Sequence, residues 1–512
     1  MTYFFQKQKK ELLMRCVSAA VAVLATFVFC SPLPGSAPAQ AGENDAPKLL
    51  KVVALSRHGV RSPTQSPETL NAWSDRRWPV WNTAPGHLTE RGADLIRAEW
   101  QGLRQSLAFD GLLPASECPA PQSVFVYADN EERTQATARA MLEGLSPGCG
   151  FKVFSRPEGT DPLFHPVRSG FVNAPVISEP ERKKLTEELS ALQDSLGADI
   201  ARIASILGLA APALCAPGQI SCTLSSMPSA LEFPHKNSRR NVSLHGGLAL
   251  ASTTAEILLL ESLEWPEKAQ LVPAAIPAPR VQYPGTPVEQ KARQIIMAPR
   301  SDRPDTRPLT FAPRWKPALL QPKDHEILVN PATARQLLPV HTRVQNAVQR
   351  FAPVAESEGM PLLLFMAEAL AGASPVADAN KAALVFLAGH DTNIVNLAGL
   401  LDLHWNNDPF PADSTPPGSM LVFRLWETEQ GDIVQASFLC QTDSAFLSTD
   451  KAVMSRAALR ESALMLPNAT ADTPAGPGLP LSEFLSQVRN ICKGVPVEKL
   501  ADAFACNVSI AP

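Results

Sequence analysis

The stretch LLKVVALSRHGVRSP at residues 49–63 decides how the rest of the chain is interpreted. Its apolar, β-branched-rich run from Lys51 to Leu55 predicts a short buried strand that ends at the following turn. That turn places His58 between Arg57 and Arg61. A basic surface turn is the alternative, but it is disfavoured because Arg57 and His58 directly continue the strand. Since ligands bind at the carboxyl ends of strands in α/β sheets, we expect a functional site here.

The same arrangement recurs far downstream in the chain. A second apolar strand, predicted for residues 382–387, ends in the turn Ala-Gly-His-Asp-Thr-Asn at 388–393. If both strands end at the same edge of one sheet, the two turns converge. His390 and Asp391 would then lie beside His58.

A third cation occupies an unusual position. Arg133 lies in the first turn of a helix that is predicted to follow another strand and to run to about Leu145. The helix dipole disfavours a cation in that turn, so the position of Arg133 favours a role beyond the helix. The alternative is that Glu131, Glu132 or Asp129 simply neutralises it.

Together these residues allow one particular chemistry. Three guanidinium groups around one imidazole suit an oxyanion with several acceptors, and phosphate matches best. Their positive field disfavours the imidazolium and keeps His58 neutral and nucleophilic. Asp391 supplies a carboxylic acid that protonates a departing alkoxide. The predicted scheme is covalent: His58 attacks phosphorus, Asp391 protonates the leaving oxygen, and water then hydrolyses the phosphohistidine.

The N-terminal residues have the layout of a secretory signal peptide. Basic residues precede an apolar run at 16–29, and the segment ends in Ala39-Gln40-Ala41, which predicts cleavage after residue 41. A single uncleaved anchor is the alternative, although the apolar run is short for a membrane span. We expect a periplasmic or secreted protein with no membrane attachment after cleavage.

The charge balance argues against a nucleic-acid partner. Residues 1–41 contain four basic residues and one acidic residue, and the whole chain has 46 Lys+Arg and 50 Asp+Glu, so cleavage leaves a net charge near −7. Such a chain does not bind nucleic acid through phosphate contacts. We expect a monomer that acts on a small-molecule phosphomonoester.

The cysteines of an exported chain are first considered as disulfide partners, and none has the CxxC spacing of a metal site. Cys215 and Cys222 bracket a short loop, and Cys118 and Cys149 flank a predicted strand and helix. The number of cysteines left after cleavage is odd, and Cys440, in an apolar run, is expected to be a buried free thiol.

The middle of the chain changes in character. After an irregular loop at 64–88 and the α/β pattern that follows, residues from about 171 onward have helical spacing. A helix predicted for Gly246 to Leu263 carries Glu256 among apolar and small residues, and twelve prolines between 266 and 322 predict an irregular excursion. Further helices are predicted at 342–356 and 361–370, and a strand pair at 419–426 and 433–439.

The predicted fold class is α/β: a central mixed sheet flanked by helices, with an inserted mainly helical domain. The predicted parts are a signal peptide (1–41), the first part of the α/β domain (42–170), the helical domain with the Pro-rich insertion 266–322 (171–339) and the second part of the α/β domain (340–512).

The motif RHGVRSP at 57–63, taken with GHDTN at 389–393, resembles the signature pair of the histidine acid phosphatases, clade two of the histidine phosphatase superfamily. The likeness is closest to the bacterial periplasmic phytases and covers most of the mature chain. Segments that also resemble the family are Trp78-Pro79, Leu88-Thr89, Arg91-Gly92, Glu132-Arg133-Thr134, Asp161 to Phe164, Ala251 to Leu259 and Thr415 to Gly418.

The resemblance implies a role for each matching residue. By it, His58 is the nucleophile and Asp391 the proton donor. The residues that it assigns to phosphoryl binding are Arg57, Arg61, Arg133 and His390, and those on the substrate side of the pocket are Thr64 and Glu256. It also implies an α/β phosphatase domain with the helical domain as a cap over the active site, and the absence of a metal or organic cofactor.

The chain departs from the family pattern at two places that concern the substrate and the disulfides. Gln65 stands where bacterial phytases often have a lysine that contacts inositol phosphates. Phe171 replaces a family cysteine, so the long-range disulfide to the C-terminal region is lost, and Cys492 is expected to pair with Cys506 instead.

The predicted function is a periplasmic acid phosphatase that hydrolyses phosphomonoesters, with phytate (inositol hexakisphosphate) as the expected substrate. A glucose-1-phosphatase-like or broad specificity is the nearest alternative. A non-catalytic phosphate or phosphosugar binder would not need Asp391. A metal-dependent phosphohydrolase would need clustered ligands, whereas the remaining histidines are scattered in the sequence without ligand spacing.

Overall fold

The computed structural model describes residues 46–73, 76–208, 224–270, 329–451, 454, 459–504 and 508–510. Ala46–Pro512 is one compact unit. The predicted signal peptide, most of the Pro-rich insertion and the cysteines at 215, 222 and 506 lie outside the described residues.

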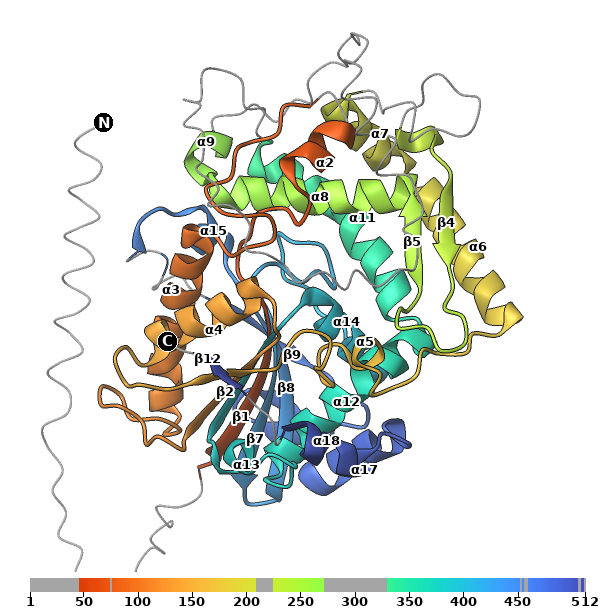
Figure 1. The fold of residues 1–512 in the computed structure, drawn as a ribbon. Helices are drawn as coiled ribbons and strands as arrows, with labels where there is room; N and C mark the ends of the chain where they lie inside the picture. Colours follow the sequence, from red (N-terminus) through yellow and green to blue (C-terminus); the bar gives the residue numbers. More distant parts are fainter. Residues whose placement is uncertain are drawn as a thin grey trace, which may run out of the picture. The chain divides into compact units, whose positions relative to one another are not determined.

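A mixed sheet forms the centre of this unit (Figure 1). Its strand order is β10-β11-β8-β7-β1-β6-β2-β3-β12, with β9 paired to β8, and the central neighbours β1, β6, β2 and β3 are parallel. The strands of the described residues are β1 (Lys48–Arg57), β2 (Val124–Ala128), β3 (Val153–Ser155), β4 (Ser229–Glu232), β5 (Ser243–Gly246), β6 (Leu384–Gly389), β7 (Met420–Thr428), β8 (Gly431–Gln441), β9 (Leu459–Leu464), β10 (Ala471–Thr473), β11 (Gly476–Pro480) and β12 (Val508–Ile510).

Helices cover both faces of the sheet. Along β1, side chains alternate between two cores: Val53 and Leu55 face one and Val52 and Ala54 the other. Figure 1 shows α12 and α17 on one side and α3 and α4 on the other. The helices are α2 (Pro67–Trp73), α3 (Glu90–Phe109), α4 (Glu132–Leu145), α5 (Pro166–Ser169), α6 (Glu179–Ser195), α7 (Gly197–Leu207), η2 (Leu224–Ser226), α8 (Gly247–Glu264), α9 (Pro266–Gln270), α11 (Pro331–Gln349), α12 (Ala352–Leu370), α13 (Ala377–Lys381), α14 (Asp391–Leu401), α15 (Asp443–Leu447), α17 (Leu481–Ile491) and α18 (Val497–Phe504).

A third apolar core belongs to the helical middle section. It unites α6, α7, α8 and α11, with Leu185, Ile203, Leu258 and Leu337 among its buried side chains. The core draws on residues from Ile177 to Val354, so α11 connects it to the region after the predicted boundary at 339. The predicted mixed α/β fold is thus confirmed, and the domain boundaries stay a prediction.

The register of the sheet brings the two predicted turns together. Arg57 pairs with Gly389 between β1 and β6, and Ala128 pairs with Ala388 between β2 and β6. Three parallel strands therefore end level with one another, and the residue after each end lies at one edge. The His58 amide donates to the Gly389 carbonyl at 3.0 Å, which links the first two turns directly.

Some predicted element bounds were wrong. The loop 64–88 contains helix α2, and the irregular excursion begins with helix α9, Pro266–Gln270. The helices predicted at 342–356 and 361–370 are instead α11 and α12, because Pro339 and Pro361 lie inside helices and do not end them. Pro361 is buried in the core, so packing compensates for the missing N–H.

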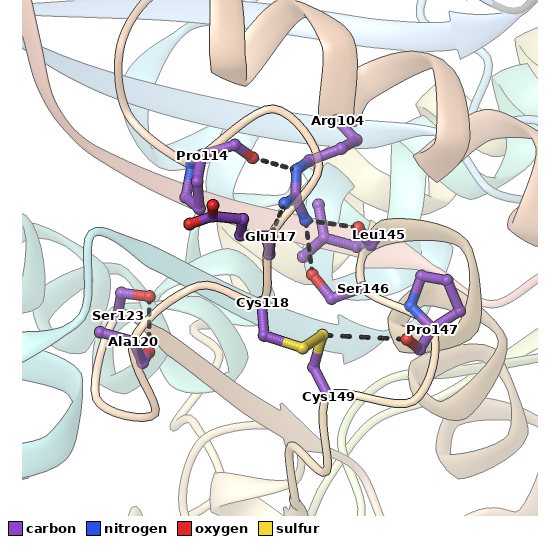
Figure 2. The surroundings of a disulfide bond; sticks show 10 residues. All are labelled: Arg104, Pro114, Glu117, Cys118, Ala120, Ser123, Leu145, Ser146, Pro147 and Cys149. Atoms are coloured by element: carbon purple, nitrogen blue, oxygen red, sulfur yellow. Dashed lines mark hydrogen bonds between the residues drawn. A yellow bond between two sulfur atoms is a disulfide. The ribbon is translucent and has the colours of Figure 1, made fainter.

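The cysteine predictions were partly correct. Cys118 and Cys149 form a disulfide, and Cys440 is a buried free thiol. Figure 2 shows Arg104 beside the disulfide, where its guanidinium donates to the carbonyls of Pro114, Glu117 and Leu145 and to Ser146 Oγ. The predicted disulfide between Cys492 and Cys506 was wrong, because Cys492 is a free thiol. Its Sγ lies 3.3 Å from the Met360 carbonyl. Across the described parts of the chain, no helix is both long and apolar enough to cross a membrane.

Candidate active site

His58 directly follows β1 and is buried at the sheet edge. Its Nδ1 lies 2.9 Å from the Gly59 carbonyl, which can only accept, so Nδ1 carries a proton. In the neutral ring the lone pair is therefore at Nε2. Helix α3 packs directly against this turn at Gly92. A Cβ at Gly92 would lie 2.1 Å from the Val60 carbonyl oxygen, so only glycine permits this contact.

The predicted arginines surround this ring. The pKa of His58 lies well below its ordinary value. Burial is the largest cause, followed by the positive charges of Arg61, Arg57 and Arg133. Each of the three guanidinium groups has a buried Nε–H with no hydrogen-bond partner among the described residues. Unpaired buried donors are costly, so the arrangement calls for a ligand that offers several acceptors.

Two carboxylates face these cations from different parts of the fold. Glu256 on α8 forms an ion pair with Arg57, and its Oε1 lies 3.1 Å from Arg61 Nη2. Asp391, the first residue of α14, has its Oδ2 at 3.1 Å from Arg57 Nη2. Arg57 Nη1 also donates to the Thr415 carbonyl. The positive charge of the arginines is thus offset by acidic side chains of the chain itself.

The ion pairs keep both carboxylates ionised. Burial alone would raise the pKa of Glu256, but Arg61 and Arg57 outweigh burial and lower it. Burial would likewise raise the pKa of Asp391, and Arg57 and His341 hold it well below the ordinary range. A carboxylate that is ionised must gain a proton before it can donate one.

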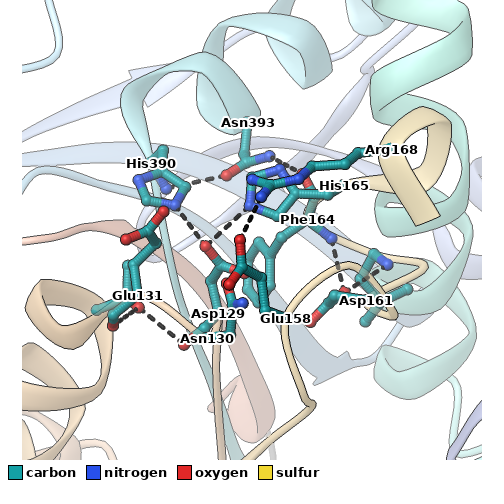
Figure 3. A network of polar contacts seen from close by, with 12 residues as sticks. Asp129, Asn130, Glu131, Glu158, Asp161, Phe164, His165, Arg168, His390 and Asn393 are labelled. Atoms are coloured by element: carbon teal, nitrogen blue, oxygen red, sulfur yellow. Dashed lines mark hydrogen bonds and ion pairs between the residues drawn. The ribbon is translucent and has the colours of Figure 1, made fainter. Parts of the chain in front are cut away.

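The second histidine turn has a different set of neighbours. His390 Nε2 lies 2.7 Å from Asp129 Oδ2, and His165 Nε2 lies 2.9 Å from the same oxygen. Figure 3 shows Asp129 between the two rings, with Asn393 holding the His390 backbone. The rings of His58 and His390 are 5.7 Å apart and nearly perpendicular.

Arg133 and Thr64 lie at the rim of the site. Arg133 Nη1 lies 3.3 Å from Glu131 Oε2 and 3.5 Å from the Gly86 carbonyl, so the neutralisation by a neighbouring carboxylate is present but partial. Thr64 is exposed, and a Cβ at Gly86 would lie 3.6 Å from it and 3.7 Å from Arg133 Nη1. The structure therefore brings every residue of the predicted site to the same edge of the sheet.

Sequence reasoning missed His341, Asp129 and His165 as parts of this site. His341 on α11 has a buried Nε2 without a partner among the described residues, and its ring lies near Glu256 and Asp391. No motif marks it, because it belongs to an ordinary amphipathic helix of the third core. Asp129 could have been found, because it follows the end of β2 as His58 follows β1.

Two clusters bring three potential metal donors together: Asp129 with His165 and His390, and Glu256 with His341 and Asp391. Neither suits a divalent cation. In the first cluster both imidazoles donate to the carboxylate, so their donor nitrogens carry protons. In the second the carboxylates pair with guanidinium groups, whose positive charge opposes a second cation.

Comparison with known proteins shows similarity to histidine phosphatases in sequence and in structure. A sequence model of the histidine phosphatase superfamily (branch 2) matches residues 48–192 and 335–439, which include both histidine turns. Phytase AppA of Escherichia coli (strain K12) is 30% identical over 411 residues, covering 77% of this chain and 81% of that protein. Glucose-1-phosphatase of Providencia rettgeri is 24% identical, covering 86% and 91%. The structure of Hafnia alvei phytase in complex with myo-inositol hexakis sulphate matches with a TM-score of 0.64 at 28% identity, covering 90% of this chain and 99% of that chain.

Proposed function

The chain belongs to branch 2 of the histidine phosphatase superfamily and is a phosphatase, and on this basis we propose that His58 is its nucleophile, Asp391 its proton donor and phytate its substrate. One observation carries the proposal. A buried neutral imidazole has its Nδ1–H committed to the Gly59 carbonyl and its free Nε2 among guanidinium groups. Such a group is suited to attack phosphorus and not to accept a proton from solvent.

The remaining site residues hold the transferred group. Arg57, Arg61 and Arg133 offer unpaired N–H groups to the equatorial oxygens, whose negative charge they neutralise as the bond to the leaving oxygen breaks. We also assign His390, whose Nε2 donates to Asp129, to binding of the phosphoryl group. Nε2 of His58 forms the bond to phosphorus while the ester oxygen departs, and a water molecule later returns the phosphoryl group to solvent.

Substrate binding prepares Asp391 for its role. A bound phosphoryl dianion takes over the charge of Arg57, whose Nη2 lies 3.1 Å from Asp391 Oδ2. The dianion also adds negative charge beside the carboxylate, and both effects raise the pKa of Asp391. The carboxyl then gains a proton from solvent more readily in acid, so we expect the highest activity at acidic pH. A flat or alkaline profile would count against this role.

Two observations bear on the substrate. The likeness to a phytase solved with an inositol hexakis sulphate favours phytate, because sulphate esters mimic the phosphate esters of that ring. Gln65 is half-buried next to Thr64 and provides no cation for a second phosphate, which favours a glucose-1-phosphatase-like specificity as the second candidate. Thr64 and Glu256 are the residues that we assign to the substrate side in either case.

The proposal includes export and a monomeric enzyme. The disulfide between Cys118 and Cys149 supports folding in an oxidising compartment such as the periplasm. Mass determination of the secreted chain tests both the removal of residues 1–41 and the monomeric state.

Rapid-quench trapping with labelled substrate tests the mechanism. The wild-type enzyme should yield an acid-labile, alkali-stable phosphoenzyme at His58, and His58→Ala should yield none. Near wild-type turnover by His58→Ala would refute the covalent scheme. A comparison of kcat/KM on phytate, glucose 1-phosphate and p-nitrophenyl phosphate distinguishes the two candidate substrates.

A further inference from the structure

The mechanism above leaves one group next to the phosphoryl site unused. His165 directly precedes α5, and its Nε2 donates to the same Asp129 oxygen that accepts from His390 (Figure 3). A carboxylate only accepts, so both rings carry a proton at Nε2 in this arrangement. The other carboxylate oxygen, Asp129 Oδ1, is buried and without a partner among the described residues.

Asp129 is a buried anion directly behind a residue that is to contact a phosphoryl dianion. Burial by itself would raise the pKa of Asp129, but the hydrogen bonds from His165 and His390 outweigh burial and hold the pKa well below the ordinary range. With two neutral rings, the cluster has one negative charge, which opposes substrate binding. With His165 protonated, the cluster is neutral.

We propose that His165 is a positioning residue whose imidazolium offsets the Asp129 charge behind His390 and thereby strengthens phosphoryl binding at acidic pH. His390 remains the group that touches the substrate, and His165 acts on it through Asp129. The ring centroids of His165 and His390 are 5.8 Å apart, so the added charge lies one ring away from the substrate. The inference rests on the proposed function, because it requires a phosphoryl group beside His390.

The surroundings of His165 favour its charged form. Burial opposes protonation, but Asp129 outweighs it, and the pKa of His165 is raised. Asp161 and Glu358 act in the same direction, with smaller contributions than that of Asp129. The His165 side chain is 28% exposed, so it can exchange protons with solvent. The groups that face it from the neighbouring elements are Asp129, His390, Asp161, Glu358 and the Arg168–Glu158 ion pair.

The variant His165→Gln separates charge from hydrogen bonding, because the glutamine amide N–H reaches the place of Nε2 but stays neutral. We expect KM for p-nitrophenyl phosphate and the inhibition constant of inorganic phosphate to rise about 3- to 10-fold near pH 5. Both constants should approach the wild-type values about two pH units above the titration of His165. The value of kcat should change less than KM, because the charge acts on binding.

His245→Gln is the matched control. His245 is exposed on the β4–β5 hairpin, and its Nε2 lies 3.2 Å from Glu232 Oε2, so it forms a histidine–carboxylate pair that is not among the groups assigned to the phosphoryl site. It should leave both constants unchanged at every pH. An equal loss in His165→Gln at every pH would show a merely structural role and overturn the inference.

A second measurement, the NMR titration of His165, uses the wild-type protein. If protonated His165 favours phosphate, bound phosphate must favour protonated His165 by the same factor. Saturating inorganic phosphate should therefore shift the midpoint of the His165 NMR titration upward by about 0.5 to 1 pH unit, the same 3- to 10-fold coupling. An unshifted midpoint overturns the inference even when His165→Gln does not fold. An absent phosphohistidine together with a shifted midpoint would refute the proposed function and leave the coupling intact.

Discussion

Two histidines follow neighbouring parallel strands at the same edge of the sheet, yet their surroundings make them different chemical groups. His58 follows β1, donates to a backbone carbonyl and is surrounded by arginines. His390 follows β6 and donates to Asp129. The first ring uses Nδ1 for its hydrogen bond, whereas the second uses Nε2, which is occupied by a carboxylate.

The difference shows that the sheet decides where these side chains lie and their neighbours decide what they do. Strand register brings Arg57 level with Gly389 and so places both turns together. Burial and the guanidinium groups lower the pKa of His58. Burial also lowers the pKa of His390, and the Asp129 carboxylate holds the proton of this ring at Nε2. Each prediction below tests this division of roles.

The largest effect is expected from removing the nucleophile. His58→Ala should lower kcat by at least about 10⁴-fold, because no other group replaces a covalent nucleophile. His390→Ala should lower kcat/KM by roughly 10²-fold and still form a phosphoenzyme. Quench-flow trapping of both variants measures this. A trapped phosphoenzyme in His58→Ala, or its loss in His390→Ala alone, would reverse the two roles.

The acid on the His390 turn should matter according to the leaving group. Asp391→Asn should slow alkyl phosphates by about 10² to 10⁴-fold, because an alkoxide needs a proton to depart. Hydrolysis of p-nitrophenyl phosphate should be slowed far less, since nitrophenolate leaves readily without one. Steady-state kinetics on the two ester types provide the test, and equal losses would exclude Asp391 as the acid.

Arg133 should contribute binding and transition-state charge to the His58 side. Arg133→Gln is expected to lower kcat/KM by about 10²-fold through loss of a charge-assisted contact. Arg489→Gln is the control, because Arg489 is exposed and pairs with Glu368 on α12. A loss as large in the control as in Arg133→Gln would show that general surface charge, and not the site, is responsible.

Glu256 should compete with the product. Glu256→Gln removes the carboxylate that pairs with Arg57 and Arg61, so inorganic phosphate should inhibit about 10-fold more strongly. The inhibition constants of inorganic phosphate for the wild type and Glu256→Gln, measured at the same pH, test this expectation. Weaker inhibition would instead mean that Glu256 positions the arginines for phosphate.

The smallest effect concerns stability and pH. An unfolded histidine titrates near pH 6.5, and folding lowers the pKa of His58 well below that value. The unfolded state therefore binds more protons, so this stabilisation is present above about pH 6.5 and is lost as the pH falls toward the folded pKa. Between about pH 7 and 5, the free energy of unfolding of His58→Asn should fall by roughly 1 to 2 kcal/mol less than that of the wild type. Urea unfolding in phosphate-free buffer measures it, and an unchanged slope would contradict a neutral buried His58.

Much of the sheet edge could be predicted from short patterns. The apolar runs before His58 and His390 identified β1 and β6, and a strand end followed by a charged turn identified the site. The bounds of α11 and α12 could not be predicted, because Pro339 and Pro361 are ordinary helix breakers whose tolerance depends on tertiary packing.

The missed parts of the site share a physical reason. His341 reaches the site from the helical core, and its role depends on which helix face packs toward Glu256, which local sequence does not encode. His165 stands on a loop and becomes significant only through its contact with Asp129. Contacts between distant segments are a property of the fold and not of spacing along the chain.

The carboxylate bridge from Glu256 to the two arginines makes binding an exchange of partners. An arriving ester must displace an anion that the protein already holds, so affinity reflects the difference between two anions and not the full attraction of the arginines. We therefore expect monovalent anions to be poor competitors in such an exchange and a doubly charged ester to succeed. On the proposed mechanism, the same carboxylate returns to the arginines when phosphate departs, so these cations have an anionic partner between turnovers.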